Sequence, residues 1–315
     1  MTPKPLEDCL PSDLRGPDTT TTPLSAGLSG AGVYRVESGG RSFVLKVAAE
    51  SESTPDWRRA LHVQQIAADA GLSPRVVHVD EERRAVVTDF VADRSFANFF
   101  RAPSTHEAAL VQLGQTVRRI HALPIPADAP GRDPREFLAQ MWEVVRSGFT
   151  LPDFVGDTVR RALSEDPPTG ARTVLGHNDL NPGNLVYDGE SIVLLDWAAS
   201  GPADASYDLA TIAVFLRMDD SDCLRLLSAY DGADVTTLPG RFLYSRRLVA
   251  ALAGTMQLYI ARQMNHPGAS GAETMETTLA LGEFYQRMGA GVLKLGTADG
   301  QWAFGLALLK TGVAL

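Results

Sequence analysis

Alternating apolar and polar residues mark two short stretches near the start of the chain, at residues 33–36 (VYRV) and 42–47 (SFVLKV). Such alternation is typical of strands with one buried face, and Ser38-Gly39-Gly40 between them predicts a tight turn. Apolar runs at 74–78 and 85–91 predict two more strands. Between these pairs, residues 56–70 have the apolar spacing of a helix. Residues 23–92 therefore predict a small antiparallel sheet with one helix.

After residue 92 the apolar period becomes that of amphipathic helices. Leu110, Leu113, Val117 and Ile120 follow one another at helical spacing, and Pro124 ends that segment. Further helices are expected at 134–146, 153–164, about 208–217, 219–230, 241–264 and 272–290. The apolar part of the tail after residue 291 should pack on them. Residues 1–22, rich in Pro, Asp and Thr, predict a leader that is flexible or lies across the surface. The pattern indicates an α+β protein with a small sheet part at 23–92 and a larger, mostly helical part at 93–315.

A short hairpin interrupts the helical part. Residues 192–195 are too few and too β-branched for a helix and predict a buried strand, and Asp188-Gly189 before them predicts a turn. The strand should pair with residues 185–187. That pairing would bring Asn184 and Asp196 to the same end of the hairpin, with Asp179 in the loop that leads into it.

This arrangement has a chemical meaning. An amide oxygen from Asn184 and a carboxylate from Asp196 are hard ligands suited to Mg²⁺. The second carboxylate, Asp179, can accept a proton from a substrate hydroxyl. Phosphoryl transfer from ATP requires these parts, because the enzyme mainly positions groups and neutralises charge.

A glycine-rich stretch precedes the first predicted strands. Gly27, Gly30 and Gly32 would let backbone amides approach phosphates without Cβ clashes, and Ser29 lies at the tip of this loop. Lys46 on the next strand can bridge the α- and β-phosphates. No Gly-Lys-Ser/Thr follows, so the stretch is not a Walker A motif.

The segments HNDLNPGN and LLDWAASGPADASYDLA resemble the H-x-D-x-x-x-x-N and D-F-G-type motifs of protein-kinase-like enzymes, and in detail those of the aminoglycoside phosphotransferase and choline kinase superfamily. The resemblance implies a two-lobed protein-kinase-like fold and phosphorylation of a small molecule. It implies Asp179 as catalytic base, Asn184 and Asp196 as Mg²⁺ ligands, and Lys46 with the Gly27–Gly32 loop as the triphosphate site. The backbone from Asp89 to Val91 would then contact adenine.

One feature departs from that family. The strand lysine usually pairs with a glutamate in the following helix, and residues 56–70 contain none. His62, Gln64 and Gln65 are the candidates for its place, whereas Glu50 and Glu52 precede the helix. The missing glutamate leaves open a nucleotide-binding pseudokinase. In the same motif region, His177 is expected to brace the loop by hydrogen bonding. Asp208 is expected to be a helix N-cap, although the family places a support of the catalytic loop there.

The composition limits which ligands and which cellular location are expected. The 315 residues carry a net charge of −9, which disfavours nucleic acid as a ligand. Two distant cysteines, no signal pattern and no apolar run long enough to span a bilayer favour a cytoplasmic protein without membrane contact.

The sequence leaves two classes of phosphoryl acceptor open. VFLRMDDSDCLRLLSAYDG resembles the choline or thiamine kinase branch, so that a small cationic acceptor could contact one of the acids in or beside it (Asp219, Asp220, Asp222 and Asp231). An aminoglycoside or other antibiotic, phosphorylated by a resistance enzyme, is the alternative.

Overall fold

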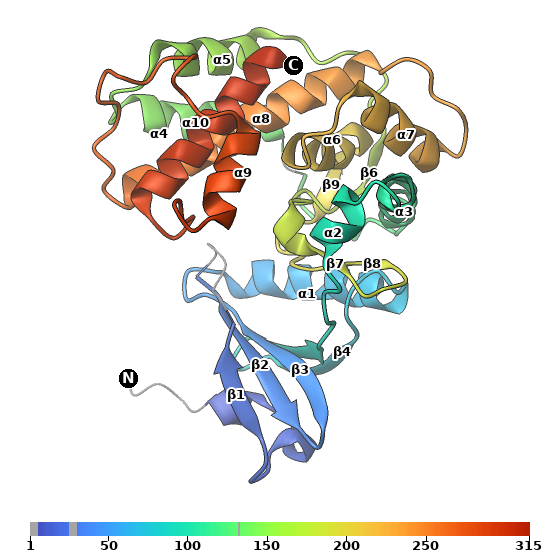
Figure 1. Ribbon diagram of the computed structural model, residues 1–315. Coiled ribbons are helices and arrows are strands. Elements are labelled where there is room, and N and C mark those ends of the chain that lie inside the picture. The colour runs from blue at the N-terminus through green and yellow to red at the C-terminus, as the bar shows by residue number, and fades with distance from the viewer. Residues whose placement is uncertain (1–5, 25–29, 132) are drawn as a thin grey trace.

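A computed structural model describes residues 6–24, 30–131 and 133–315, and its chain forms two lobes (Figure 1). The smaller lobe contains a five-stranded antiparallel sheet in the order β1-β2-β3-β5-β4. Its elements are β1 (Thr20–Pro23), β2 (Gly32–Ser38), β3 (Arg41–Val47), α1 (Thr54–Asp69), β4 (Val76–Asp80) and β5 (Ala85–Asp89). The four strands and the helix predicted here are confirmed, and β1 is an additional edge strand.

The described part of residues 1–22 is not a flexible leader. Two short 3-10 helices, Leu6–Cys9 and Ser12–Leu14, precede β1. Leu10 is fully buried and packs with Val36, Phe43 and other residues of one sheet face. Of the two alternatives, flexible or lying across the surface, the second describes this segment, and the high Pro and Asp content made its buried apolar residues hard to recognise.

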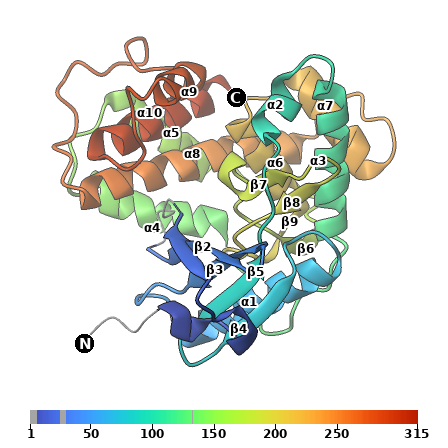
Figure 2. The same ribbon diagram turned by 60° about the horizontal axis from the view of Figure 1, so that its bottom comes forward.

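The larger lobe is mostly helical. Its helices are α2 (Phe96–Arg101), α3 (His106–Ile120), α4 (Pro134–Arg146), α5 (Asp153–Ser164), α6 (Ala205–Phe215), α7 (Asp220–Asp231), α8 (Gly240–Gln263), α9 (Leu281–Gly289) and α10 (Ala298–Ala314). The long α8 packs against α4, α6 and α10, while α3 packs against α7 (Figure 2). The predicted helices are present except for 272–280, where turns replace the helix. There Thr277 accepts a hydrogen bond from the Thr274 amide and donates to Ala272, and such bonds compete with helix formation.

Two short sheets hold the segment between α5 and α6. β7 (Leu185–Tyr187) pairs with β8 (Ile192–Leu194), which confirms the predicted hairpin. β6 (Thr173–Gly176) pairs with β9 (Gly201–Asp204), and this pairing was not predicted. The β6–β9 pair closes the base of the loop that runs from residue 177 to 200. None of the helices described is long and apolar enough to cross a membrane.

The hairpin also connects the lobes. The Leu194 amide donates to the Leu72 carbonyl at 2.8 Å, and the Trp197 indole N–H donates to Ser73 Oγ at 3.1 Å. Both acceptors follow α1. The end of the hairpin is thus fixed against the smaller lobe by direct hydrogen bonds.

Candidate active site

Asp208, buried in the first turns of α6, holds the start of the loop at residue 177. Its two carboxylate oxygens accept the backbone N–H groups of His177 and Asn178 at 2.8 and 2.7 Å. A third bond comes from His121 Nε2 at 3.1 Å. Burial alone would raise the pKa of Asp208, but the His121 bond and the two nearby imidazoles hold it below the usual value. Asp208 is therefore a brace for the loop and not the N-cap of α6, which is Asp204.

His177 is a structural residue of this loop, as predicted. Its ring is fully buried, and Nε2 lies 3.0 Å from the Leu195 carbonyl. The ring also packs against Trp197 with centroids 4.7 Å apart. These contacts tie the start of the loop to the end of the β7–β8 hairpin.

Asp179 faces the open side of the loop. Its Oδ1 accepts a hydrogen bond from Asn181 at 2.8 Å, and its Oδ2 accepts one from Asn184 at 2.9 Å. Burial raises the pKa of Asp179, and the charge of Asp196 adds to the rise, while the two amide bonds oppose it. A carboxylate that is oriented by two donors and made more basic by burial is suited to accept a proton. Asn181 was not singled out from the sequence, although it lies inside the HNDLNPGN motif.

Asn184 and Asp196 present oxygen atoms to the same space. The Asn184 amide nitrogen is used for Asp179, and no described group donates to its Oδ1. Asp196 has φ at 57°, in the left-handed region, and its Oδ1 accepts from Lys46. Its Oδ2 receives no hydrogen bond from the described residues. One amide and one carboxylate oxygen without protein donors form a set that fits Mg²⁺.

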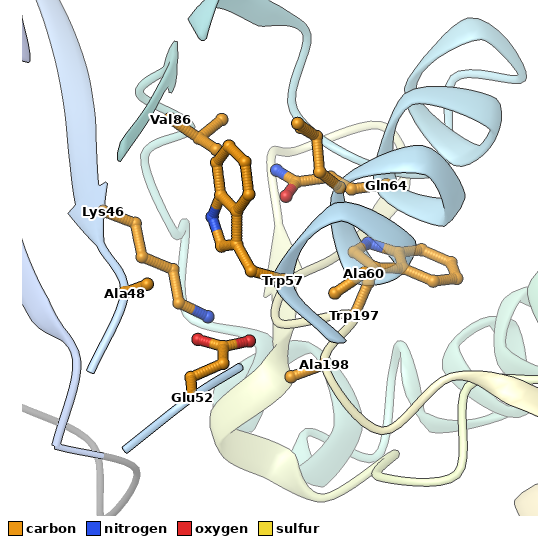
Figure 3. Close-up of a pocket in the computed structure, with 10 residues that line it drawn as sticks. Lys46, Ala48, Glu52, Trp57, Ala60, Gln64, Val86, Trp197 and Ala198 are labelled. Atoms are coloured by element: carbon orange, nitrogen blue, oxygen red, sulfur yellow. The ribbon is translucent and has the colours of Figure 1, made fainter. Parts of the chain in front are cut away.

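Lys46 on β3 bridges the lobes. Its Nζ lies 2.8 Å from Asp196 Oδ1, and this ion pair is about one-third exposed. Its positive charge lowers the pKa of Asp196 against the opposing effect of burial. Figure 3 shows Lys46 pointing toward the Glu52 carboxylate in a cavity that Gln64 of α1 also lines. Glu52, which precedes α1 in the sequence, therefore stands beside the lysine where a helix glutamate was missing.

A cavity of about 340 Å³ extends from Lys46 along the sheet and the lobe connection. Asp89 and Val91 line it, together with Val33, Val44 and Val86. The Asp89 carboxylate is occupied by Arg75 at 2.9 Å, so its peptide is the part available to a ligand. The Val91 N–H has no acceptor among the described residues.

The glycine-rich stretch is described only in part. Gly30, with φ at 73°, and Gly32 lie at the entrance to β2. The positive φ of Gly30 explains why a glycine is needed there. Gly27 and Ser29 lie outside the described residues.

A second cavity, of about 610 Å³, opens on the other side of Asn184 and Asp196. Asp179 lines it, and its walls are mainly apolar: Phe215, Met256, Ile260, Tyr285, Met288, Leu295 and Phe304. Asn184 and Asp196 therefore lie where two cavities meet, each of the size of a small-molecule site, and Asp179 lines the second cavity.

None of the four acids expected near a cationic ligand lines this second cavity. Asp219 caps α7, Asp222 pairs with His106 at 2.8 Å, and Asp220 lies 3.5 Å from Arg246. Asp231 is exposed at the end of α7. Asp219, Asp220 and Asp222 lie at the start of α7, where acids ordinarily stabilise the helix.

Comparison with known proteins agrees with this geometry. The model of the phosphotransferase enzyme family matches residues 20–243, which include Lys46, Asp179, Asn184 and Asp196. A search of the curated proteins found no match.

Several solved structures share the fold. A choline/ethanolamine kinase family protein from Mesorhizobium loti is 21% identical, with a TM-score of 0.58 over 95% of this chain and 94% of that one. An aminoglycoside-3'-phosphotransferase of type VIII is 24% identical, with a TM-score of 0.57 over 76% and 95%. LicA, the choline kinase of Streptococcus pneumoniae, solved in complex with AMP, is 17% identical, with a TM-score of 0.56 over 89% and 94%. At these identities the likeness concerns the fold, which is the two-lobed protein-kinase-like fold.

Proposed function

The chain belongs to the phosphotransferase enzyme family, and from this we propose that it transfers the γ-phosphoryl group of ATP to a hydroxyl of a small molecule. The observation that carries the proposal is that two cavities meet at Asn184 and Asp196, and that Asp179 lines the second of them. One cavity has Lys46 and the Asp89–Val91 backbone in its walls, and the other has room for an acceptor. Asn184 and Asp196 lie in the walls of both.

Asp179 acts on the acceptor. As the acceptor oxygen bonds to the γ-phosphorus, the bond from that phosphorus to the β,γ-bridging oxygen breaks and ADP leaves. The hydroxyl proton passes to the Asp179 carboxylate, whose raised pKa makes it a better acceptor at neutral pH. Asn181 and Asn184 keep the carboxylate in place by their two hydrogen bonds.

Asn184 Oδ1 and Asp196 Oδ2 would hold Mg²⁺, whose charge would neutralise that of the phosphates when it is bound. Lys46 would supply a further positive charge to the triphosphate. Asp196 holds this lysine by an ion pair and Glu52 lines the same cavity beside it, which supports a working kinase over a pseudokinase. The peptides of Asp89 and Val91 would contact the base, and Gly30 and Gly32 would lie near the phosphates.

The two cysteines support a cytoplasmic location. Cys9 and Cys223 are both free and buried. Burial raises the pKa of the Cys223 thiol to about 12, so that the unreactive protonated form is retained. A protein that keeps its thiols reduced fits a reducing compartment.

The central test is the substitution Asp179→Asn. Asparagine keeps the size and polarity of the side chain but cannot accept the proton, so kcat should fall by about 10²–10⁴-fold. The Kd for Mg-ATP should stay near that of the wild type, because Asn184 and Asp196 remain. ADP release with a panel of hydroxyl compounds and calorimetric titration of Mg-ATP measure the two quantities.

Asp196→Ala serves as the matched control, because it should impair Mg-ATP binding together with turnover. Circular dichroism checks that both variants fold. If Asp179→Asn loses nucleotide binding while bound substrate still turns over normally, the role of Asp179 as a base is wrong.

A further inference from the structure

A further hollow of about 270 Å³ lies next to the second cavity. Pro182, Phe215, Tyr285 and Met288 line both spaces, so the two are adjacent. The hollow is therefore the nearest space for the rest of a molecule whose hydroxyl lies at Asp179.

Apart from the catalytic carboxylates, the charged residues that line the second cavity and the hollow are all positive. Apart from Asp179 and Asp196, the only charged residues among those lining them are Arg101 and Arg217. Both side chains are exposed, and neither forms an ion pair or hydrogen bond with another described residue. Burial raises the pKa of Tyr285 to about 12, and the positive charges of Arg217 and Arg101 oppose this rise. The two guanidinium groups thus act on the same point of the wall.

The backbone at Arg217 is unusual for an arginine. Residue 217 follows Leu216, the C-cap of α6, and has the left-handed conformation, with φ at 57°, where glycine is the common residue. Its amide donates to Val214 and the next amide donates to Ala213, which is the Schellman pattern of a helix end. A Cβ on Gly282 would overlap Nη1 of Arg217, so Gly282 provides space for the side chain. An arginine is therefore kept where the backbone would favour glycine.

We propose that the acceptor is an alcohol with an apolar body and an anionic group, and that Arg101 and Arg217 bind this group at the far end of the cavity. This inference rests on the proposed function and names its substrate class. Arginine is suited to carboxylates and phosphates because its planar fork of donors matches their oxygens. A polycationic aminoglycoside or a choline-like acceptor would place its positive charge beside two arginines, with no acid other than the catalytic pair among the described lining residues.

The first experiment compares acceptors that differ only in charge. A six-carbon ω-hydroxy carboxylate, the diol and the ω-amino alcohol of the same length form one series. The corresponding hydroxymethyl benzenes with carboxylate, methyl and aminomethyl groups form a second. ADP release should give the highest kcat/KM for the carboxylate in at least one series. A preference for the amino alcohols overturns the inference and leaves the proposed function intact.

The second experiment replaces Arg217 by glycine. Because glycine suits the left-handed backbone, Arg217→Gly should melt at the same temperature as the wild type or higher. The KM for the carboxylate should rise about tenfold or more, which is typical of a lost charge-assisted hydrogen bond. The KM for the diol and for ATP should not change. Arg287→Ala, an exposed arginine on α9 outside the cavity lining, is the matched control and should leave all three constants unchanged.

Two further outcomes separate the two proposals. An equal rise of the KM for carboxylate and diol in Arg217→Gly overturns the role of the arginine as an anion site. If no acceptor of either charge raises ADP release above that of Asp179→Asn, the proposed function and the substrate class fail together.

Discussion

Asp208 shows how one buried carboxylate can determine the geometry of the loop that carries the candidate active site. It accepts two consecutive backbone N–H groups, at His177 and Asn178, immediately before Asp179. Asn178 has φ at 64°, so the chain turns sharply there. The carboxylate satisfies two amides that the turn would otherwise leave without partners, and a buried unpaired amide is costly.

Replacing Asp208 by asparagine should therefore destabilise the protein. The amide side chain can accept only through one oxygen, so that one of the two backbone donors loses its partner, at a cost of about 1–3 kcal/mol. Urea unfolding at pH 7 measures the change in the free energy of unfolding. The exposed Asp13→Asn is the control and should have no effect.

The effect of Asp208→Asn should depend on pH with a defined sign. The folded-state pKa of Asp208 is lowered, so its contribution to stability is present above the unfolded value, about 3.9, and is lost as pH falls through the lower folded pKa. The difference between wild type and variant should therefore shrink below about pH 4. An equal difference at neutral and acidic pH would contradict this account of the brace.

At the scale of helices and strands, features set by neighbouring residues could be predicted from the sequence. Features set by contacts between distant residues could not. The β7–β8 hairpin was predictable because Asp188-Gly189 and the β-branched residues 192–193 act locally. For Asp208 the local pattern favoured an N-cap and only the family resemblance implied a brace, because that role depends on contacts with His121 and His177 far away in the chain. A helix was expected to begin at residue 272, but α9 begins at Leu281. The prediction was wrong because the side chains of Thr274 and Thr277 accept backbone N–H groups that a helix would use.

The acceptor cavity could not be predicted for the same reason. Its walls come from α6, α8, α9, α10 and the loop after Asp179, and no single stretch of sequence carries the pattern. The acids of α7 were prominent in the sequence, yet they lie on another part of the lobe. Lys46, Asp179, Asn184 and Asp196 could be proposed as site residues from motif spacing, and the structure places them close together.

The close packing of α8 on α10 is another feature that belongs to the scale of helices and strands. A Cβ on Gly254 would lie 2.6 Å from Leu309 Cγ and 2.9 Å from the Gly305 carbonyl. The helices thus approach closely where two glycines face each other. Met256 and Ile260 of α8 and Phe304 of α10 line the second cavity, so this spacing also sets its width.

Gly254→Ala should push these helices apart. Overpacking of this kind costs about 1–3 kcal/mol of stability. The KM for the acceptor should change while the Kd for Mg-ATP stays constant, because the nucleotide cavity does not include α8 or α10. Thermal unfolding and steady-state kinetics test this. Gly240→Ala in the same helix, with no atom within 4 Å of its added Cβ, is the control. Equal effects of the two variants would show that helix propensity, and not packing, is responsible.

At the scale of the whole molecule, the lobes do not coincide with the hydrophobic cores. Val63 and Ala67 of α1, with Leu72 after it, belong to the core that continues through the larger lobe. The opposite face of the sheet has its own core, made with the N-terminal segment. In Figure 1, α1 lies between the sheet and the larger lobe. The sheet is therefore the part of the molecule whose stability depends on a small separate core.

This division predicts a local effect of Leu10→Ala. Leu10 is fully buried against the sheet, and truncating a buried leucine costs about 2–5 kcal/mol. Because the small core is separate, the loss should appear as more frequent opening of the sheet while α1 and the larger lobe remain folded. Amide hydrogen exchange should become faster in β1, β2 and β3 and stay unchanged in α8. Leu138→Ala, at an equally buried site in the α4–α8 core, should give the reverse pattern. Because Lys46 lies on β3, bound Mg-ATP should stabilise the sheet. At a hundred times Kd the added stability is about 2.7 kcal/mol, which should slow amide exchange in the sheet of Leu10→Ala. Uniformly faster exchange over the whole chain would show instead that the two cores unfold as one unit.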